Sequence, residues 1–273
     1  MSTQAERART FRALHERKSA FVIPNPWDVG SARALAQIGF EALATTSAGF
    51  AFSIGKQDNR VSREEVIEHI AALAAATSLP LSADLEKGFG DDPATVAETI
   101  RLAAEAGAVG GSIEDSTHRT EDPVFALEAA AERIGAAVEA ARSLPFPFTL
   151  TARAENFLVG RPDLDDTICR LQAYQDAGAD VLYAPAVVEA DHIATIVRSV
   201  DRPVNVLMGA AGVRLDLARL SAMGVRRVSV GGALYRAAFG AMLRAAREMH
   251  DQGTFAFTAD AASYREISAL IKP

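Results

Sequence analysis

The stretch LPLSADLEKGFGDDPATVAETIRLAAEAGAVGGSIED, residues 79–115, contains one complete unit of strand, helix and strand. The short apolar runs at 79–86 and 108–115 are typical of buried parallel strands. A helical stretch at 93–106 lies between them, with Asp92 and Pro93 predicting its start and Gly107 its end. This stretch therefore predicts a parallel βαβ unit in which both strands end in carboxylates.

The same unit repeats along the whole chain. Further strands are predicted at 20–26, 40–47, 147–155, 179–185, 202–209 and 225–232, and further helices at 28–38, 62–76, 122–142, 163–177, 188–199, 213–222 and 233–248. Asp122 and Pro123 repeat the helix-start signal. Eight strand–helix units predict a single-domain α/β fold, a (β/α)8 TIM barrel. An open doubly wound sheet is the competing architecture, but no Gly-rich dinucleotide-binding sequence follows the first strand.

Two segments lie outside the eight units. A helix is predicted at 3–17, and the last residues, 249–273, combine apolar residues with a helical pattern. We therefore assign residues 1–248 to the barrel with its N-terminal helix. Residues 249–273 form a C-terminal helical extension, which is expected to dock on its own chain or on another subunit.

Composition narrows the class of protein. The 273 residues are 49% hydrophobic and 23% charged, which excludes a disordered chain. A formal net charge of −7 disfavours nucleic acid and anionic membranes as partners. A single cysteine excludes an internal disulfide framework and a Cys-rich zinc site. We see no signal peptide and no membrane-spanning run, so a cytoplasmic location is expected.

Acidic side chains are concentrated where the active site of such a barrel lies, at the carboxyl ends of the strands. Asp84 and Glu86 lie at the end of the third predicted strand, and Glu114 and Asp115 lie at the end of the fourth. Like charges packed together are costly unless a cation neutralises them, and Mg²⁺ prefers oxygen ligands. Asp84 and Glu86 share one face of their strand, and Glu114 can reach the same point. Arg153 supplies the opposite charge in a form that suits a carboxylate or a phosphate.

Some of these residues are also compatible with a purely structural role. Asp115 is equally compatible with capping the following helix. Arg153 is also compatible with a simple ion pair to Glu155. Cys169 lies on a predicted helix and is expected to be a buried apolar residue, not a catalyst.

The motif DLEKGFG (84–90), followed by GGSIEDS (110–116) and TARAEN (151–156), resembles the isocitrate lyase/phosphoenolpyruvate mutase superfamily. The resemblance extends from PNPWDVGSARALAQIGFEALATTS near the N-terminus to about residue 247. It implies a (β/α)8 barrel that is often a homotetramer with exchanged C-terminal helices, a dimer being the alternative. It also implies Mg²⁺, with Mn²⁺ as an alternative, and chemistry on small 2-oxo or 2-hydroxy carboxylates through an enolate-like intermediate.

The resemblance implies a role for each matching residue. Asp84 is implied as the direct metal ligand, and Glu86 and Glu114 as ligands acting largely through water. Arg153 is implied as the clamp for a carboxylate or an oxyanion. The backbone amides of Ser47 and Ala48 are implied to hold the substrate carboxylate. Asp58 is implied to lie near the reacting centre. Asn205 and Trp27 are implied to line the pocket. Trp27 is equally compatible with a core or subunit-interface position.

The sequence departs from this family in the loop after the fourth strand. The lyase branch carries a Lys-(Lys/Arg)-Cys-Gly-His sequence there, and the mutase branch carries Lys and Asn. This chain has neither, and its loop retains His118, which is either a proton donor or acceptor or a solvated loop residue. Ala184 and Pro185 replace a glutamate of the lyases, and Glu86 stands where aspartate is usual.

We therefore predict a Mg²⁺-dependent C–C bond lyase, decarboxylase or hydrolase acting on a small, oxaloacetate-like 2-oxo or 2-hydroxy carboxylate. Three alternatives remain open. The first is P–C bond chemistry of the phosphoenolpyruvate mutase or phosphonopyruvate hydrolase type. The second is a non-catalytic protein that binds 2-oxo acids. The third is another barrel enzyme, with a phosphate site at SVGGAL (229–234).

Overall fold

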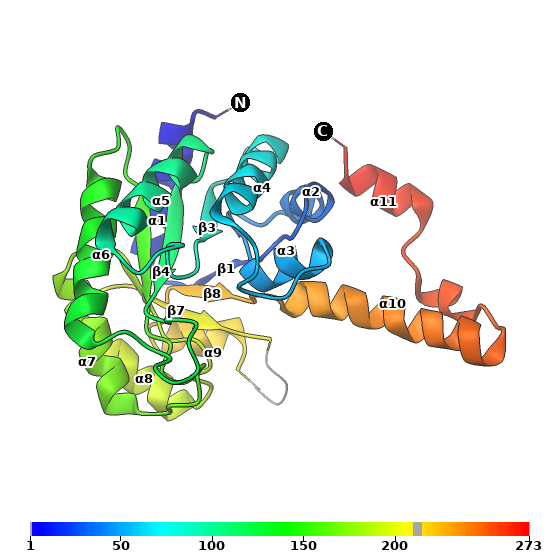
Figure 1. The fold of residues 1–273 in the computed structure, drawn as a ribbon. Coiled ribbons are helices and arrows are strands. Elements are labelled where there is room, and N and C mark those ends of the chain that lie inside the picture. The colour runs from blue at the N-terminus through cyan, green and yellow to red at the C-terminus, as the bar shows by residue number, and fades with distance from the viewer. Residues whose placement is uncertain (1, 210–214, 273) are drawn as a thin grey trace.

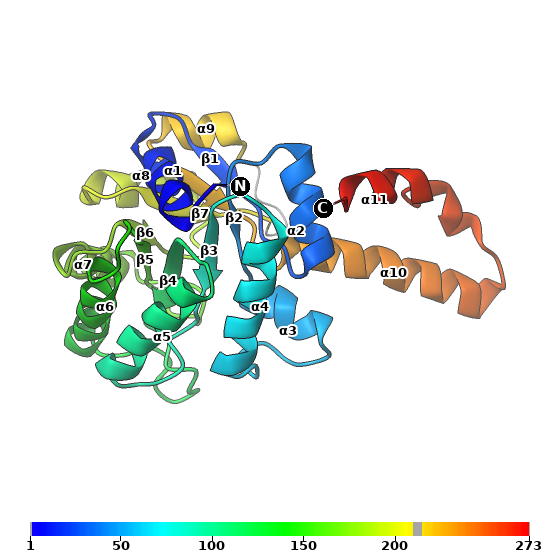
Figure 2. The same cartoon turned by 90° about the horizontal axis from the view of Figure 1, so that it is seen from above.

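The computed structural model describes residues 2–209 and 215–272, and its core is the predicted α/β barrel (Figure 1). Across the described residues, eight parallel strands form one sheet in the order β1-β8-β7-β6-β5-β4-β3-β2. The strands are β1 (Phe21–Ile23), β2 (Leu43–Ala44), β3 (Leu81–Asp84), β4 (Gly110–Glu114), β5 (Thr149–Arg153), β6 (Val181–Tyr183), β7 (Val204–Leu207) and β8 (Arg227–Ser229). The helices are α1 (Gln4–Glu16), α2 (Val29–Ile38), α3 (Ser47–Ser53), α4 (Arg63–Ala76), α5 (Pro93–Glu105), α6 (Leu127–Arg142), α7 (Leu164–Asp176), α8 (Ala190–Ser199), α9 (Leu217–Ala222), α10 (Ala233–Gln252), the 3-10 helix η1 (Ala256–Asp260) and α11 (Tyr264–Leu270). The helices surround the strands in both views, as expected for a TIM barrel (Figure 2).

The ring of strands closes at a narrow seam between β1 and β2. These two strands stand at the opposite ends of the strand order, so the barrel closes where they meet. The backbone N–H of Ala44 donates to the carbonyl of Pro24 at 3.1 Å. The Asn25 side chain donates to the carbonyl of Thr45 at 2.9 Å. One backbone hydrogen bond and one amide side chain therefore join the two strands.

The unit at 79–115 folds as its sequence predicts. Asp92 caps α5 and Pro93 is its first residue, where the missing proline N–H leaves no bond unmade. Gly107 follows the helix with a φ of 104°, and a Cβ there would lie 2.8 Å from the Cβ of Ala74. Glycine is therefore required by both the backbone conformation and the close approach of α4.

Helix α1 closes the amino-terminal mouth of the barrel. Its Phe11 and Leu14 are buried in a small apolar cluster with Phe21 and Val109. A Cβ on Gly110 would lie 2.7 Å from Cε1 of Phe11, so the absence of a side chain there lets the helix approach β4. The larger apolar core lies between the sheet and the outer helices. The carboxyl ends of the strands are left as the open end of the barrel.

Some local predictions are wrong. Helix α6 begins at Leu127, not at residue 122, because Pro123 lies in a loop that is held by an isolated antiparallel bridge between residues 116 and 124. Helix α3 was not predicted, because its seven residues follow directly from an apolar run. Cys169 is exposed, not buried, since it lies on the outer face of α7. Helix α9 begins at Leu217, and residues 213 and 214 of the predicted helix lie outside the described residues.

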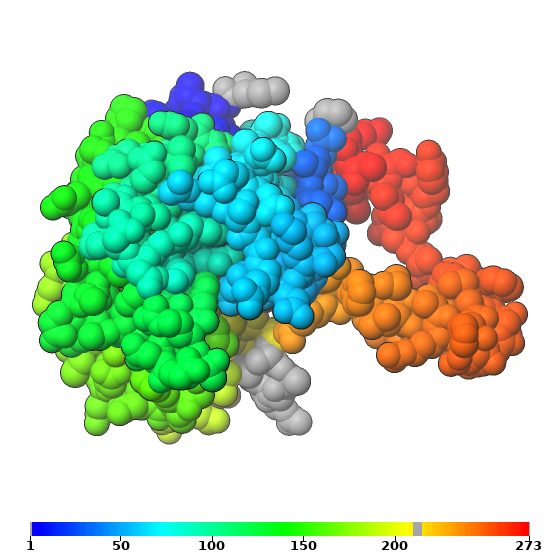
Figure 3. All heavy atoms as spheres, viewed as in Figure 1, coloured from blue at the N-terminus to red at the C-terminus, as the bar shows by residue number. Residues whose placement is uncertain are grey.

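The C-terminal region forms an arm that stands away from the barrel. Helix α10 runs on to Gln252, past the predicted end at 248, and none of its residues is buried. Figures 1 and 3 show α10 projecting outward, with η1 at its far end and α11 turning back toward α2. The large apolar side chains that the arm leaves exposed are Phe239, Met242, Leu243, Met249, Phe255, Tyr264, Ile267 and Ile271. Among the described helices, none is long and apolar enough to cross a membrane.

Candidate active site

Arg153, the last residue of β5, lies at the centre of an acidic cluster at the carboxyl end of the barrel. Its Nη1 is 3.0 Å from Asp84 Oδ1, and its Nη2 is 3.0 Å from Glu114 Oε2. Its Nε is 2.8 Å from Glu155 Oε1, and its guanidinium carbon lies 5.3 Å from the centre of the Tyr183 ring. Only 11% of the Arg153 side chain is exposed. Although burial lowers the pKa of Arg153, the surrounding carboxylates hold it above its usual value, so the side chain stays charged.

Asp84, at the end of β3, is held through both of its carboxylate oxygens. Oδ2 accepts the backbone N–H of Ser47 at 3.0 Å, and Oδ1 accepts from Arg153. The Asp84 backbone N–H donates to Thr45 Oγ1 at 2.7 Å. The parallel register sets Asp84 beside Ser112 of β4. Strands β2, β3, β4 and β5 therefore all contribute to the position of this one carboxylate.

Glu86 lies two residues further on and is buried without a partner. Its backbone is left-handed, with a φ of 49°, and its Oε1 has no hydrogen-bond partner among the described residues. Burial, and after it the charges of Asp84 and Glu114, raises the pKa of Glu86 to about 8. A bound cation would relieve both the missing contact and the repulsion between these carboxylates.

The donors of this cluster fit a hard divalent cation. Asp84, Glu86 and Glu114 offer only oxygen, which Mg²⁺ and Mn²⁺ accept. Within the described part of the chain, no three acidic, His or Cys side chains are yet arranged around one point that could hold a metal ion. Arg153 is bonded to one oxygen of Asp84 and one of Glu114. A cation bound at these residues would therefore share both carboxylates with Arg153 or compete with it for them.

His118 lies over this cluster from the loop after β4. Its Nε2 is 2.8 Å from Glu114 Oε1, and 18% of its side chain is exposed. Its φ of 59° places it in the left-handed region, which turns the chain back toward the strand end. Burial opposes ionisation of Glu114, but Arg153 and His118 hold the pKa of Glu114 below its usual value. The loop therefore brings an imidazole to the edge of the acidic cluster.

Asp58 approaches the cluster from the loop after α3. Its side chain is half-buried. Burial, and after it the charge of Asp84, raises the pKa of Asp58, while a contact with the Ser47 side chain opposes this rise. Asp58 also contributes to the raised pKa of Glu86. Asp58 therefore belongs to the same electrostatic group as the strand-end carboxylates.

The remaining predicted site residues lie in different surroundings. Ser47 and Ala48 begin α3, and the Ser47 amide is bonded to Asp84. Asn205 lines the same cavity of about 60 Å³ as Asp84, but its Oδ1 accepts from Arg227 Nε at 2.9 Å. Trp27 lies outside this cavity, in an apolar groove between α2, α10 and α11. The structure thus brings together all the predicted residues except Trp27.

Asp115 belongs to the framework beneath the cluster and caps no helix. Its Oδ1 accepts the backbone N–H of Glu155 at 2.8 Å. Its Oδ2 accepts from the Tyr174 hydroxyl at 2.5 Å and from Arg170 Nη1 at 3.0 Å. Asp115 therefore fixes the turn after β5, where Glu155 contacts Arg153.

Arg133 of α6, which no motif in the sequence marks, holds the loop after β3. Only 2% of Arg133 is exposed. Its Nη2 donates to the carbonyls of Gly90, at 2.9 Å, and Lys87, and its Nε donates to the carbonyl of Asp91 at 3.1 Å. Its guanidinium carbon lies 4.1 Å from the centre of the Phe125 ring.

In the loop at 229–234, two of the backbone amides that could hold a phosphate are already engaged within the chain. The backbone N–H groups of Val230 and Gly231 both donate to Asn25 Oδ1, each at 2.9 Å. A phosphate site there would need these N–H groups. The contacts disfavour the phosphate-site alternative and instead give Asn25 a structural role in the barrel.

The chain is similar to a family of known proteins and to several solved structures. The family model for phosphoenolpyruvate phosphomutase matches residues 11–250. A crystal structure from Burkholderia cenocepacia J2315, provisionally named a lyase/mutase, is 64% identical with a TM-score of 0.96, covering 99% of this chain and 97% of that one. The oxaloacetate decarboxylase of Chromohalobacter salexigens is 28% identical over 91% of this chain and 87% of its own length. A phosphonopyruvate hydrolase solved with oxalate and Mg²⁺ is 26% identical with a TM-score of 0.85, covering 97% of this chain and 94% of that one.

Proposed function

This chain belongs to the phosphoenolpyruvate mutase/isocitrate lyase superfamily, and we propose that it is a Mg²⁺-dependent enzyme that breaks a C–C bond in an oxaloacetate-like 2-oxo or 2-hydroxy carboxylate. Its relatives include lyases, decarboxylases and hydrolases of small carboxylates. The observation that carries the finer proposal is the position of Arg153. This buried cation is shared by three carboxylates beside the unpartnered Glu86, at the open end of the barrel.

The chain's own residues account for binding. A substrate carboxylate or developing oxyanion would compete with Asp84 and Glu114 for the Arg153 guanidinium, whose fork suits two oxygens. At the start of α3, the amide of Ala48, and that of Ser47 once it leaves Asp84 Oδ2, would hold the other end of the substrate. Asp84 is the proposed direct ligand of Mg²⁺, with Glu86 and Glu114 nearby. When bound, the cation supplies positive charge that favours the oxyanion.

The bond-breaking step needs an electron sink and a proton. In a decarboxylation of oxaloacetate, the bond between C3 and the C4 carboxylate breaks and CO2 leaves. The electron pair of that bond passes through C3 to the 2-oxo oxygen, which becomes an enolate oxyanion. Arg153 stabilises that charge, and its effect is strong because only 11% of its side chain is exposed. The carbon that carried the bond then needs a proton in a decarboxylation, and Asp58 and His118 are the two candidate donors. Cys169 takes no part, because it lies exposed on α7.

Product formation from oxaloacetate tests this proposal. We expect Mg²⁺-dependent turnover to pyruvate, or to acetate and oxalate, above the rate of a protein-free blank containing the same Mg²⁺. Asp84→Asn should abolish the metal-dependent part, whereas Glu98→Gln should leave it intact. Glu98 is the control because it is an exposed residue of α5 paired only with Arg101. Metal-dependent turnover by Asp84→Asn would overturn the proposed role of the cluster.

The same assay separates the P–C bond alternative. Phosphonopyruvate is offered in parallel, and release of inorganic phosphate or formation of phosphoenolpyruvate is measured. A relative solved with oxalate and Mg²⁺ is a phosphonopyruvate hydrolase, which favours including this substrate. Turnover of phosphonopyruvate without turnover of oxaloacetate would replace C–C by P–C chemistry at the same residues.

Thermal unfolding separates an enzyme from a non-catalytic binding protein. A ligand at about 100 times its dissociation constant adds roughly 2.7 kcal/mol. That corresponds to an increase of about 5 °C in Tm for a domain of this size. We expect this increase only with Mg²⁺ and oxalate together. The same increase without turnover of any 2-oxo acid would identify a binding protein instead.

We also propose that the chain forms a homo-oligomer, a tetramer or a dimer, through the C-terminal arm. Helix α10 buries none of its residues, and Phe255 is 63% exposed. Apolar side chains arranged along one projecting helix are typical of an interface that another copy covers. Light scattering on the purified chain is expected to give a mass of two or four copies. A monomer at micromolar concentration would contradict this assignment.

A further inference from the structure

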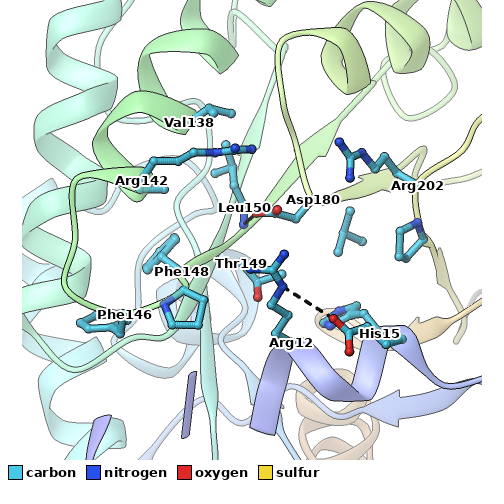
Figure 4. A pocket seen from close by; sticks show the side chains of 15 residues that line it. Arg12, His15, Val138, Arg142, Phe146, Phe148, Thr149, Leu150, Asp180 and Arg202 are labelled. Carbon is cyan, nitrogen blue, oxygen red and sulfur yellow. Dashed lines mark hydrogen bonds and ion pairs between the residues drawn. The ribbon is translucent and has the colours of Figure 1, made fainter. Parts of the chain in front are cut away.

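A second cavity lies at the opposite end of the barrel from the acidic cluster. Its volume is about 420 Å³, against about 60 Å³ for the cavity at Asp84. Its walls come from α1, from the end of α6, and from the chain entering β5, β6 and β7 (Figure 4). A cavity of this size is large enough for an organic molecule. Substrate of a TIM-barrel enzyme binds at the carboxyl ends of the strands, so this cavity is not part of that site.

Positive side chains predominate around this cavity. Arg12, Arg142 and Arg202 line it, against the carboxylates of Glu16 and Asp180. Figure 4 shows the three arginines approaching Asp180 from different sides. Burial raises the pKa of Asp180, and the backbone N–H of Leu150, followed by the charges of Arg142, Arg12 and Arg202, opposes that rise. The lining thus holds three arginines against two carboxylates, on a chain whose net charge is −7.

The guanidinium groups are weakly engaged within the chain. Arg202 makes no ion pair or hydrogen bond with the described residues, and Arg142 donates only to the carbonyl of Gly178, at 2.9 Å. Arg12 is 3.7 Å from Glu16, in an exposed pair of the kind that contributes little to stability. Asp180 is engaged on its other side, where it accepts the backbone N–H of Leu150 at 2.9 Å. The arginines therefore keep free donors for an external anion.

A buried arginine, Arg227, lies behind His15 and lines the cavity at Asp84, not this one. His15 lines this cavity, and its Nε2 is 3.4 Å from Nη1 of Arg227. His15 Nδ1 is 2.9 Å from the carbonyl of Phe11, to which it donates, so Nε2 is the nitrogen that faces Arg227. Arg227 is 5% exposed, and its other contacts are the neutral side chains of Asn205 and Thr151. In the described chain, then, no carboxylate neutralises this arginine.

The rest of the wall is apolar. Phe146, Pro147 and Phe148 form one side of the cavity, and Val138 and Pro203 extend it. Aromatic and proline surfaces of this kind pack well against a flat ring. The cavity therefore combines a flat apolar wall with several arginines, which suits a ligand having both an aromatic and an anionic part.

From this arrangement we propose that the cavity at the amino-terminal mouth of the barrel binds a small aromatic or heterocyclic phosphate. Arg142 and Arg202 contact the phosphate oxygens, with Arg12 at the rim. The ring lies against Phe146 and Pro147. Arginine favours phosphate because its planar fork donates two parallel hydrogen bonds. This site is independent of the proposed C–C bond chemistry, since it shares no residue with the acidic cluster.

Calorimetric titration with phenyl phosphate tests the proposal. The whole chain is saturated beforehand with Mg²⁺ and oxalate, so that the carboxyl-end site is blocked. We expect phenyl phosphate to bind more tightly than inorganic phosphate, and phenol not to bind. Arg142→Gln and Arg202→Gln should each weaken binding by about tenfold or more, as loss of a charge-assisted hydrogen bond does. Arg101→Gln, an exposed arginine on α5, is the matched control and should leave the affinity unchanged.

Several results would overturn this inference. One is the absence of binding at millimolar phenyl phosphate. Another is an affinity that falls when Mg²⁺ and oxalate are added, because that would place the probe in the carboxyl-end site. A third is equal affinity in the Arg202→Gln and wild-type proteins. Arg202 has no contact partner in the described chain, so its replacement leaves folding intact, and unfolding curves of each variant verify this.

Discussion

Replacing His15 by glutamine should change how the stability of the protein depends on pH. His15 is 5% exposed and lies between the rings of Phe11 and Phe21, with centroid distances of 4.8 and 5.1 Å. Burial, and after it the charge of Arg227, lowers the pKa of His15 to about 3 from an ordinary value of 6.5. The folded protein therefore excludes a proton that the unfolded chain accepts.

The sign and size of the effect follow from this difference. Above pH 6.5 the histidine is neutral in both states, so its full contribution to stability is present. As the pH falls below that value, only the unfolded chain binds the proton, and the free energy of unfolding decreases by about 1.4 kcal/mol per pH unit. The loss reaches roughly 2 kcal/mol near pH 5 and continues until about pH 3, where the folded state also titrates.

Denaturant unfolding at several pH values between about 7 and 5, with EDTA present, measures this loss. Glu86 has a raised pKa and works in the opposite direction over the same range, so the informative quantity is the difference between variant and wild type. His15→Gln should lose less stability than wild type on acidification, by roughly 2 kcal/mol near pH 5. His250→Gln, at a side chain 88% exposed, is the control and should follow wild type. Parallel curves for His15→Gln and wild type would refute the assignment of a neutral, buried His15.

Three further predictions concern the framework and the solitary thiol. Arg133→Met removes the donors that hold the loop after β3, so we expect a loss of about 3 kcal/mol in unfolding free energy and weaker Mg²⁺ binding, whereas Arg101→Met should change neither. Gly110→Ala should cost about 1–3 kcal/mol because its Cβ would lie 2.7 Å from a ring carbon of Phe11. Gly135→Ala on α6 has open space and should instead be neutral or slightly stabilising in the same unfolding assay. Cys169 should react with a thiol reagent in the native protein without loss of turnover, and inactivation on labelling would contradict its assignment as a bystander.

The sequence predicts the barrel well because the alternation of apolar strand runs and helical stretches is regular, and each element is marked by nearby residues. Each strand is a short apolar run, and signals such as Asp92-Pro93 and Gly107 mark helix ends within a few residues. The same kind of signal fails at Asp122-Pro123, where a bridge between two loop residues competes with helix formation. Helix α3 is missed for another reason, since seven residues are too few to show a helical period.

The site is predicted only in outline, because side-chain pairing depends on the register of strands and on long-range contacts. The strand-end carboxylates are evident in the sequence, but the choice of partners by Arg153 is not. Arg133 escapes notice because its contacts are backbone carbonyls, which no sequence pattern marks. Trp27 lies apart from the cavity at Asp84 because it packs edge-to-face on Tyr235, at a centroid distance of 5.5 Å.

The amide of Asn25, which joins β1 to β2, is chemically durable as well as structurally central. An asparagine deamidates when the backbone nitrogen of the next residue attacks its side-chain amide and ammonia is released. The next residue here is Pro26, whose ring nitrogen carries no hydrogen, so this cyclisation is blocked. Asn59, which precedes Arg60 in an exposed loop, has no such protection. Prolonged warm storage should therefore convert Asn59 to aspartate long before it alters the side chain on which closure of the barrel depends.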